Sequence, residues 1–367
     1  MTNFFCPGRT EIIGNHTDHQ KGRAMAAAID SGIRAEAEPN GTRQIRVFSD
    51  GFESIRVDLE HLWPDEAEIG TPAALVRGMA AVLKDSVDGL NGFDAYVVSQ
   101  IPVGKGMASS AAFSVLMGSV ICEFADGAFS SPEELAKAAR KAENRWYGKP
   151  CGLLDQLTCA IGGLIYVDFL HGKIVSLKGD FDALGLALCL TDTGGGHADS
   201  SELYARIPAD MTAVAQRFGA KWLGNVRSSD FDEEWPYHIN DPAWMRARHF
   251  FDECRRTASM ADALGLKDGR RCMDLMNESG RSSENLLRNI TDGETGAELQ
   301  KCLTLSQQLL DGVGAWRVHG GGFGGCVQAL MPDALFDPFK ACMEDHFGPG
   351  ACRRVRICPY GAGKTEE

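Results

Sequence analysis

The 367-residue sequence is short of positive charge and has no long apolar run. It carries 37 Lys and Arg against 50 Asp and Glu, which gives a net charge of −13. Nucleic acids and anionic membranes are bound through clustered Lys and Arg, so we expect neither as a partner. The longest mostly apolar stretches, such as Ala183–Leu190, are far shorter than the roughly 20 residues of a membrane-spanning helix. A few backbone amides and a metal ion could still hold a small phosphate ligand.

The sequence also lacks paired cysteine motifs. Its twelve cysteines are spread from Cys6 to Cys358 without a C-x-x-C pair. The first residues, Met1 to Gly8, contain no basic patch followed by an apolar core, so no signal peptide is predicted. We therefore expect reduced thiols and a soluble, cytoplasmic protein.

The spacing of apolar residues predicts a mixture of strands and helices. The predicted strands are Ala24–Ile29, Gly32–Glu38, Gln44–Ser49, Ser54–Asp58, Phe93–Gln100, Gly163–Phe169, Leu186–Asp192 and two extended pieces within Arg317–Met331. The predicted helices are Thr71–Lys84, Ser109–Phe124, Ser131–Tyr147, Gly152–Ile161, Ser201–Phe218, Pro242–Leu264, Lys267–Ser279 and Gly296–Leu310. Because strands and helices do not alternate strictly, the pattern indicates an α+β architecture. We expect two domains, residues 1–180 and 181–367.

A glycine-rich segment at residues 102–112, with the sequence P-V-G-K-G-M-A-S-S-A-A, lies between a predicted strand and a predicted helix. Glycines let the backbone approach phosphate oxygens, and the free N–H groups of a helix start attract anions. Ser110 could place its hydroxyl on a phosphate-bound magnesium ion. A plain turn with a serine N-cap explains the same residues, so this segment alone leaves both interpretations open.

Two other glycine segments do not fit nucleotide motifs. The tail G-A-G-K-T at residues 361–365 has Cys358 where a Walker A motif needs its first glycine, and we expect a frayed C-terminus there. The cluster H-G-G-G-F-G-G-C at residues 319–326 formally contains G-x-G-x-x-G. It is followed by a predicted strand, whereas the dinucleotide-binding fold needs a helix. A loop packed closely against a ligand or another backbone fits this cluster better.

An early segment at residues 8–19, with the sequence G-R-T-E-I-I-G-N-H-T-D-H, is unusually rich in polar side chains. His16 and His19 suggest a metal site, but no third ligand is identifiable. Asn, His and Asp side chains suit a polyol pocket better, because sugar hydroxyls need both donors and acceptors.

Three of these segments, residues 8–19, 102–112 and 319–326, resemble in this order the motifs of the GHMP kinases. The early segment resembles the galactokinase signature G-R-x-N-L-I-G-E-H-T-D-Y. Residues 141–156, K-A-E-N-R-W-Y-G-K-P-C-G-L-L-D-Q, are similar to the family's K-A-E-H…G-x-P-C-G-I-M-D-Q. Residues 275–282, L-M-N-E-S-G-R-S, are similar to L-M-x-E-S-H-x-S. The resemblance spans about residues 6–330. It implies a two-domain GHMP kinase fold, with a ribosomal-protein-like N-terminal domain, a ferredoxin-like C-terminal domain and the active site in the cleft between them.

The resemblance also implies a reaction, which is the ATP- and Mg²⁺-dependent phosphorylation of galactose to galactose 1-phosphate. Asp155 matches the proposed catalytic base, and Arg9 matches the arginine that pairs with it. The implied sugar contacts are Asn15, His16, Asp18, Gly152 and Tyr204. The implied phosphate loop is Gly104, Lys105, Gly106, Met107, Ala108, Ser109 and Ser110, with Ser110 and Glu143 on the magnesium ion. We expect a small sugar as substrate and a monomer or weak homodimer.

Elementary chemistry is compatible with these roles. A sugar hydroxyl is a poor nucleophile, and an aspartate beside it can accept its proton late in a loose transition state. A nearby guanidinium keeps such a carboxylate ionised. Without the surrounding motif, Asp155 would be interpreted as an ordinary aspartate on the surface of a helix.

The sequence departs from the galactokinase pattern at several positions. Asn15 replaces a glutamate, His19 replaces a tyrosine, residues 192–198 differ from the usual N-x-x-V-x-H-S, and only Tyr204 and Arg206 remain of Y-x-x-R-R. An amide both donates and accepts, whereas a carboxylate only accepts, so the sugar could instead be a uronic acid, a pentose or an amino sugar. An inactive sugar- and ATP-binding sensor is the alternative from another class, and the intact phosphate loop argues against it.

Overall fold

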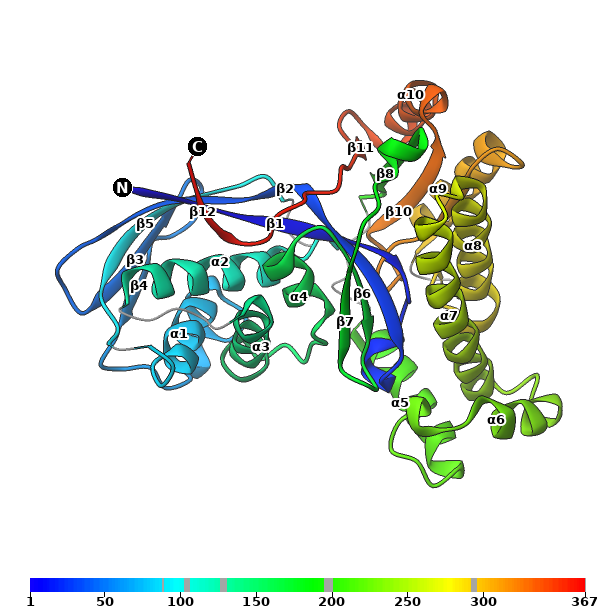
Figure 1. Cartoon of the computed structure of the whole chain (residues 1–367), viewed down its shortest axis with the longest axis horizontal. Helices are drawn as coiled ribbons and strands as arrows, with labels where there is room; N and C mark the ends of the chain where they lie inside the picture. Colours follow the sequence, from blue (N-terminus) through cyan, green and yellow to red (C-terminus); the bar gives the residue numbers. More distant parts are fainter. Residues whose placement is uncertain (88, 102–105, 126–130, 195–200, 292–295, 367) are drawn as a thin grey trace.

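Two β-sheets organise the protein (Figure 1). The computed structural model describes the chain except at residues 88, 102–105, 126–130, 195–200, 292–295 and 367. Within the described residues, one sheet has eight strands and the other has four. Helices pack on both sheets, so the α+β class predicted from the sequence is confirmed.

The larger sheet is built around two long strands near the N-terminus. Its path runs β12-β1-β2-β5-β3-β4, and β6 pairs with both β2 and β7. All pairs are antiparallel except β3 with β5. The strands are β1 (Thr2–Ile13), β2 (Arg23–Pro39), β3 (Gln44–Ser49), β4 (Ile55–Asp58), β5 (Phe93–Ser99), β6 (Leu164–Asp168), β7 (Lys173–Leu177) and β12 (Gly363–Thr365).

Four helices cover one face of this sheet (Figure 1). They are α1 (Pro72–Leu83), α2 (Ser109–Phe124), α3 (Pro132–Ala142) and α4 (Leu154–Ile161). The start of α3 follows from its sequence, because Ser131 accepts a hydrogen bond from the Glu134 amide and Pro132 occupies the first turn. A π-helical turn, Glu143–Tyr147, extends α3 and ends at Gly148, whose φ of +79° favours glycine.

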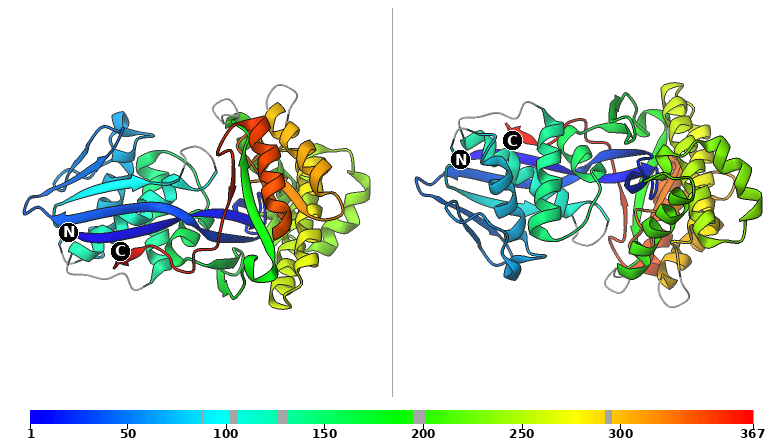
Figure 2. Two further views of the ribbon diagram at one scale, coloured as in Figure 1. Left: turned by 90° about the horizontal axis from the view of Figure 1, so that it is seen from above. Right: turned by 90° about the horizontal axis from the view of Figure 1, so that it is seen from below.

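The smaller sheet has the antiparallel order β11-β8-β10-β9. Its strands are β8 (Leu186–Asp192), β9 (Ala315–Val318), β10 (Cys326–Pro332) and β11 (Cys352–Arg354). The helices of this half are α5 (Ser201–Arg217), α6 (Ser228–Glu234), α7 (Pro242–Gly265), α8 (Gly269–Ser282), α9 (Ala297–Leu310) and α10 (Phe336–Phe347). Figure 2 shows β1 and β2 running from the region of α1–α4 towards this half.

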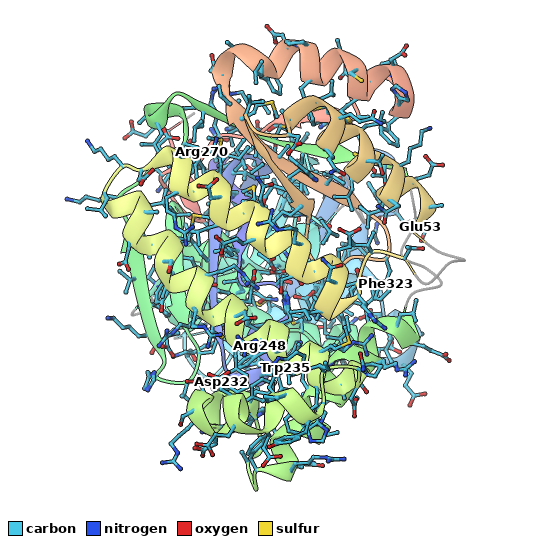
Figure 3. The ribbon with its side chains drawn as sticks, turned by 90° about the vertical axis from the view of Figure 1, so that its right-hand side faces the viewer. Glu53, Asp232, Trp235, Arg248, Arg270 and Phe323 are labelled. Carbon is cyan, nitrogen blue, oxygen red and sulfur yellow. The ribbon has the colours of Figure 1, made fainter. Side chains whose placement is uncertain are left out.

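Helix α6 is fastened to α7 by Arg248, which Figure 3 shows beside Asp232 and Trp235. Its Nη1 donates to Asp232 at 2.7 Å, its Nη2 donates to Asp252 at 2.9 Å, and its guanidinium lies 6.0 Å from the Trp235 ring centroid. The ion pair within α7 and the cation–π contact with Trp235 orient the guanidinium, which links α6 to α7 through Asp232.

Two expectations about secondary structure were wrong. Ala24–Ile29 and Gly32–Glu38 are parts of one strand, β2, because a bulge absorbs the two residues between them. Residues 8–13 of the early motif lie in β1, a strand that the sequence analysis did not predict. The C-terminal tail is not frayed, since Gly363–Thr365 pairs with Phe5–Asn3 of β1. The domain boundary near residue 180 stays a prediction.

The apolar core follows the two sheets. The largest cluster lies between the eight-stranded sheet and α1–α4 and continues into residues of α7 and α8, such as Met260 and Leu275. A second cluster lies between the smaller sheet and helices α9 and α10, and includes Val318, Leu299 and Met343. The first cluster therefore contains residues from both halves of the chain.

Arg317 in β9 is completely buried and joins the smaller sheet to β1. Its Nη2 donates to Glu11 at 2.5 Å, and its Nη1 donates to the carbonyl of Ile12 at 2.9 Å. Gln328 in β10 donates to the Thr10 hydroxyl at 2.8 Å and to the Glu11 carbonyl at 2.9 Å. These contacts fix the end of β1 that carries the early motif.

We expect Arg317→Met to lower the free energy of unfolding by about 3–5 kcal/mol, because it leaves the Glu11 carboxylate buried without its cation. Urea titration at pH 7 measures this change. The control is Arg270→Met at the surface (Figure 3), where Arg270 pairs with Asp274 at 3.2 Å. The control should cost less than about 1 kcal/mol. Equal losses for the two variants would contradict the importance of the Glu11–Arg317 pair.

Candidate active site

The early motif continues from β1 into the turn that leads to β2. Gly14 has φ +109°, and a Cβ there would collide with Ala24, so this position requires glycine. The Thr17 hydroxyl lies 2.8 Å from the Gly14 carbonyl and 2.7 Å from the Arg23 carbonyl. The turn is thereby closed by its own residues, and it presents Asn15, His16, Asp18 and His19.

Arg9 in β1 and Asp155 in the first turn of α4 meet although 146 residues separate them. Arg9 Nε donates to Asp155 Oδ1 at 2.7 Å. Burial opposes the charge of Arg9, but the Asp155 carboxylate outweighs it and raises the pKa of Arg9 above its ordinary value. Arg9 Nη1 also donates to the Gly106 carbonyl, and the Arg9 amide donates to the Met107 carbonyl at 3.3 Å.

The predicted phosphate loop lies beside Arg9. Gly104 and Lys105 fall outside the described residues, so the structure is informative only from Gly106 onwards. Gly106 and Ala108 have φ values of +73° and +60°, and α2 begins directly after them. The N-cap residue of α2 is Ala108, whose side chain cannot accept a hydrogen bond from the backbone N–H groups of the first turn. Ser109 and Ser110 are the first two residues of that helix.

Glu143 is the centre of a polar cluster next to the start of α2. Its side chain is 1% exposed. Ser110 Oγ donates to Glu143 Oε1 at 2.6 Å, and Gln156 Nε2 donates to Glu143 Oε2 at 2.6 Å. Lys149 Nζ lies 3.4 Å from Oε1. The predicted metal residues Ser110 and Glu143 are thus in direct contact.

Asp18 approaches Asp155 from the early motif. A Cβ on Gly152 would collide with the Asp18 carboxylate, so glycine is required for this approach. Burial, and then the charge of Asp155, raise the pKa of Asp18 to about 6. The His19 amide, which donates to Asp18 at 2.8 Å, partly offsets these effects. Two carboxylates therefore share this part of the site.

Asn15, His16 and Tyr204 contact the second glycine cluster. Asn15 Nδ2 donates to the Gly320 carbonyl at 2.7 Å. His16 Nε2 lies 3.1 Å from the Gly321 carbonyl, and the Tyr204 hydroxyl donates to the Gly322 carbonyl at 2.7 Å. A Cβ on Gly321 would collide with the Tyr204 ring. This confirms that the cluster is a loop packed closely against other parts of the chain. Asn15 is completely buried, and its Oδ1 has no hydrogen-bond partner in the described structure.

Both histidines of the early motif are neutral near pH 7. Burial lowers the pKa of His16, and burial together with His16 and His249 lowers the pKa of His19 to about 3. Their rings lie edge to face, with 5.6 Å between centroids. In the part of the chain that the structure describes, no group of three His, Cys, Asp or Glu residues forms a metal site.

Sequence reasoning missed two α7 residues that hold the early motif. Glu253 accepts hydrogen bonds from the Gly14 amide at 3.0 Å and from Ser279 at 2.6 Å. His249 Nε2 lies 3.0 Å from the Asn15 carbonyl. Burial opposes the charge of Glu253, but Arg256 and then His249 outweigh it and lower the pKa of Glu253 to about 2. Ser279 belongs to the L-M-N-E-S-G-R-S segment, which was the one sequence signal for this network.

Two broader properties complete the description. All twelve cysteines are free thiols. Across the described ranges, no helix combines the length and the apolar character that crossing a membrane requires.

Comparison with known proteins gives consistent matches. The family model described as the GHMP kinases N-terminal domain matches residues 74–163, and the galactokinase galactose-binding signature matches residues 2–39. The galactokinase of Lactobacillus helveticus is 30% identical over 349 residues, covering 92% of this chain and 87% of that protein. The galactokinase of Enterococcus faecalis is 31% identical over 350 residues, with the same coverage of 92% and 87%.

Solved structures match over nearly the whole chain. The crystal structure of Lactococcus lactis galactokinase complexed with galactose has a TM-score of 0.84 at 24% identity, covering 99% of this chain and 95% of that one. A mevalonate kinase structure has a TM-score of 0.69 at 16% identity, covering 98% and 99%. These matches confirm the GHMP kinase fold that the sequence motifs implied.

We expect Asp18→Asn to raise the free energy of unfolding at pH 8 by about 1–2 kcal/mol, because the fold disfavours the ionised carboxylate. The ordinary pKa of 3.8 is raised to about 6 in the folded protein. The free-energy cost of ionising Asp18 is therefore absent below pH 4 and complete above about pH 6. The stability gained by Asp18→Asn follows the same pH dependence. Urea titrations at pH 4 and pH 8 measure it, with the exposed Asp85→Asn as control. A gain that does not change with pH would contradict the raised pKa.

Proposed function

The chain belongs to the galactokinase family of the GHMP kinases, and we propose that it transfers the γ-phosphoryl group of ATP to the anomeric hydroxyl of galactose. The products would be galactose 1-phosphate and ADP. The observation that carries this proposal is the Arg9–Asp155 pair, with the Asp18 carboxylate on one side and the start of α2 on the other. An acceptor for a hydroxyl proton thereby lies close to a helix start that suits phosphates.

We propose that Asp155 is the catalytic base. It would accept the proton of the sugar hydroxyl while the oxygen–phosphorus bond forms and the bond from phosphorus to the ADP oxygen breaks. Arg9 would balance the charge of the Asp155 carboxylate through the 2.7 Å contact and would also hold the phosphate loop through Gly106. The paired guanidinium orients the carboxylate, so its position does not depend on the substrate.

We propose that the sugar contacts Asn15, His16, Asp18, Gly152 and Tyr204. Oδ1 is the atom of Asn15 left for a sugar hydroxyl, since Nδ2 already donates to Gly320. The charges of this pocket favour a neutral sugar. His16 and His19 are uncharged near pH 7, while Asp18 and Asp155 supply negative charge. A sugar carboxylate would be repelled here, which favours galactose over a uronic acid.

We propose that ATP phosphates occupy the Gly104–Ser110 segment and that Ser110 and Glu143 hold magnesium. Hydroxyl and carboxylate oxygens are ligands that magnesium prefers, and one or two carboxylates suffice when phosphates supply the rest. The magnesium ion would neutralise charge on the phosphates. Gln156 fixes the orientation of Glu143 by donating to its Oε2 at 2.6 Å. A cytoplasmic location and a monomeric or weakly dimeric state stay predictions from the sequence.

The function is tested by measuring ADP release with galactose, galacturonate, arabinose and galactosamine. We expect kcat/KM for galactose to exceed the others by at least about tenfold, as differences in pocket contacts permit. Asp155→Asn should lower turnover by about 10²–10⁴-fold, because the general base is lost, while galactose and ATP still bind. Preference for galacturonate would show that the proposed substrate is wrong. Binding of galactose and ATP without ADP release by the wild-type protein would indicate an inactive sensor.

The magnesium site is tested by titrating activity with MgCl₂ at fixed ATP. We expect Glu143→Ala to need at least about tenfold more magnesium for half-maximal rate, because one ligand is removed. The matched control is Glu53→Ala, which removes an exposed carboxylate (labelled in Figure 3). Coincident titration curves for wild type and Glu143→Ala would exclude Glu143 from the metal site.

A further inference from the structure

Lys149 is a cation at the candidate active site that no sequence motif assigns. It occupies the variable position of G-x-P-C-G, the pattern to which residues 148–152 are similar. Its Nζ lies 3.4 Å from Glu143 Oε1, the same oxygen that accepts from Ser110 at 2.6 Å. The ammonium therefore lies next to the residues proposed to bind magnesium.

The backbone places Lys149 there independently of its charge. The π-helical turn ends at Gly148 in a left-handed conformation, and the Lys149 amide donates to the Glu143 carbonyl at 3.2 Å. The backbone of Lys149 is thus held against Glu143, the first residue of the π-helical turn. Gly152 and Asp155 follow within six residues, so the same short segment passes from the Glu143 cluster to the Asp18–Asp155 carboxylates.

Lys149 is less tightly held by carboxylates than Arg9 and can therefore contact a ligand. Arg9 is engaged by Asp155 at 2.7 Å and by the Gly106 carbonyl. The Lys149 contact with Glu143 is longer, and the Lys149 side chain is 53% exposed. The side chain is long and flexible enough to change partner.

We propose that Lys149 is a further catalytic residue, which pairs with Glu143 before the nucleotide binds and contacts the phosphoryl group during its transfer. The proposal rests on the kinase function proposed above. Charge on the equatorial oxygens of the phosphoryl group is stabilised by cations fixed nearby, and lysine binds phosphate as a point charge. Lys149 itself gains and loses no proton. The hydroxyl proton goes to Asp155, and ADP leaves with the electrons of the broken bond.

A purely structural salt bridge is the alternative, and nucleotide binding distinguishes the two. The probes are magnesium–ADP and magnesium–AMP-PNP, which differ in the γ-phosphoryl group, and calorimetry measures both affinities. We expect Lys149→Met to weaken AMP-PNP at least about tenfold and ADP less than about twofold, because only AMP-PNP carries the phosphoryl group that Lys149 contacts. Turnover should fall by about 10²-fold, and Lys149→Arg should recover part of it because the charge is retained. Lys137→Met on α3 removes an exposed lysine and should leave all these values unchanged.

The outcomes separate this proposal from the kinase function itself. Equal weakening of ADP and AMP-PNP, or unchanged turnover in Lys149→Met, would overturn the role of Lys149 while leaving the kinase proposal intact. A wild-type protein that binds neither nucleotide would overturn both. Melting curves of each variant without ligand establish that the proteins compared are folded.

Discussion

The ion pair between Arg9 and Asp155 joins the three segments on which the candidate site depends. Arg9 belongs to β1, Asp155 begins α4, and the same guanidinium reaches the Gly106 carbonyl before α2. One cation thus orients the proposed base and holds the proposed phosphate loop. Arg9 also reduces the repulsion between Asp18 and Asp155, because without Arg9 the Asp18 carboxylate would lie near an unpaired Asp155 carboxylate. In this arrangement a Cβ at position 152 would collide with the Asp18 carboxylate, so glycine there leaves room for it.

Strand β1 can hold Arg9 in place because the second half of the chain supports it. Arg317 and Gln328 from the smaller sheet bind residues 10–12, and Glu253 from α7 binds the Gly14 amide. These are buried polar contacts, whose loss leaves groups unpaired and is therefore costly. The geometry of the candidate site is consequently linked to the packing of the second half of the chain.

The sequence was informative where a local pattern decides the structure. Apolar spacing predicted α2 and β8 with their observed bounds, and the serine–proline signal predicted the start of α3. The sequence was uninformative where contacts between residues far apart in the chain decide the structure. The strand character of β1 comes from pairing with β2 and β12, and the roles of Glu253 and His249 come from how α7 packs. For the site, the motifs indicated Arg9, Asp155, Ser110 and Glu143, but the contacts between them became visible only in the fold.

The departure at Asn15 has a structural explanation that does not require a different sugar. Asn15 Nδ2 donates to the Gly320 carbonyl, and the following two carbonyls are engaged by His16 and Tyr204. A glutamate at this position would place a carboxylate against a carbonyl oxygen, and both are acceptors. The amide therefore suits its contact with the glycine segment, because it can donate to the Gly320 carbonyl. The residue at position 15 and the path of residues 320–322 therefore depend on each other. The presence of asparagine at position 15 is explained by this contact, without reference to the sugar.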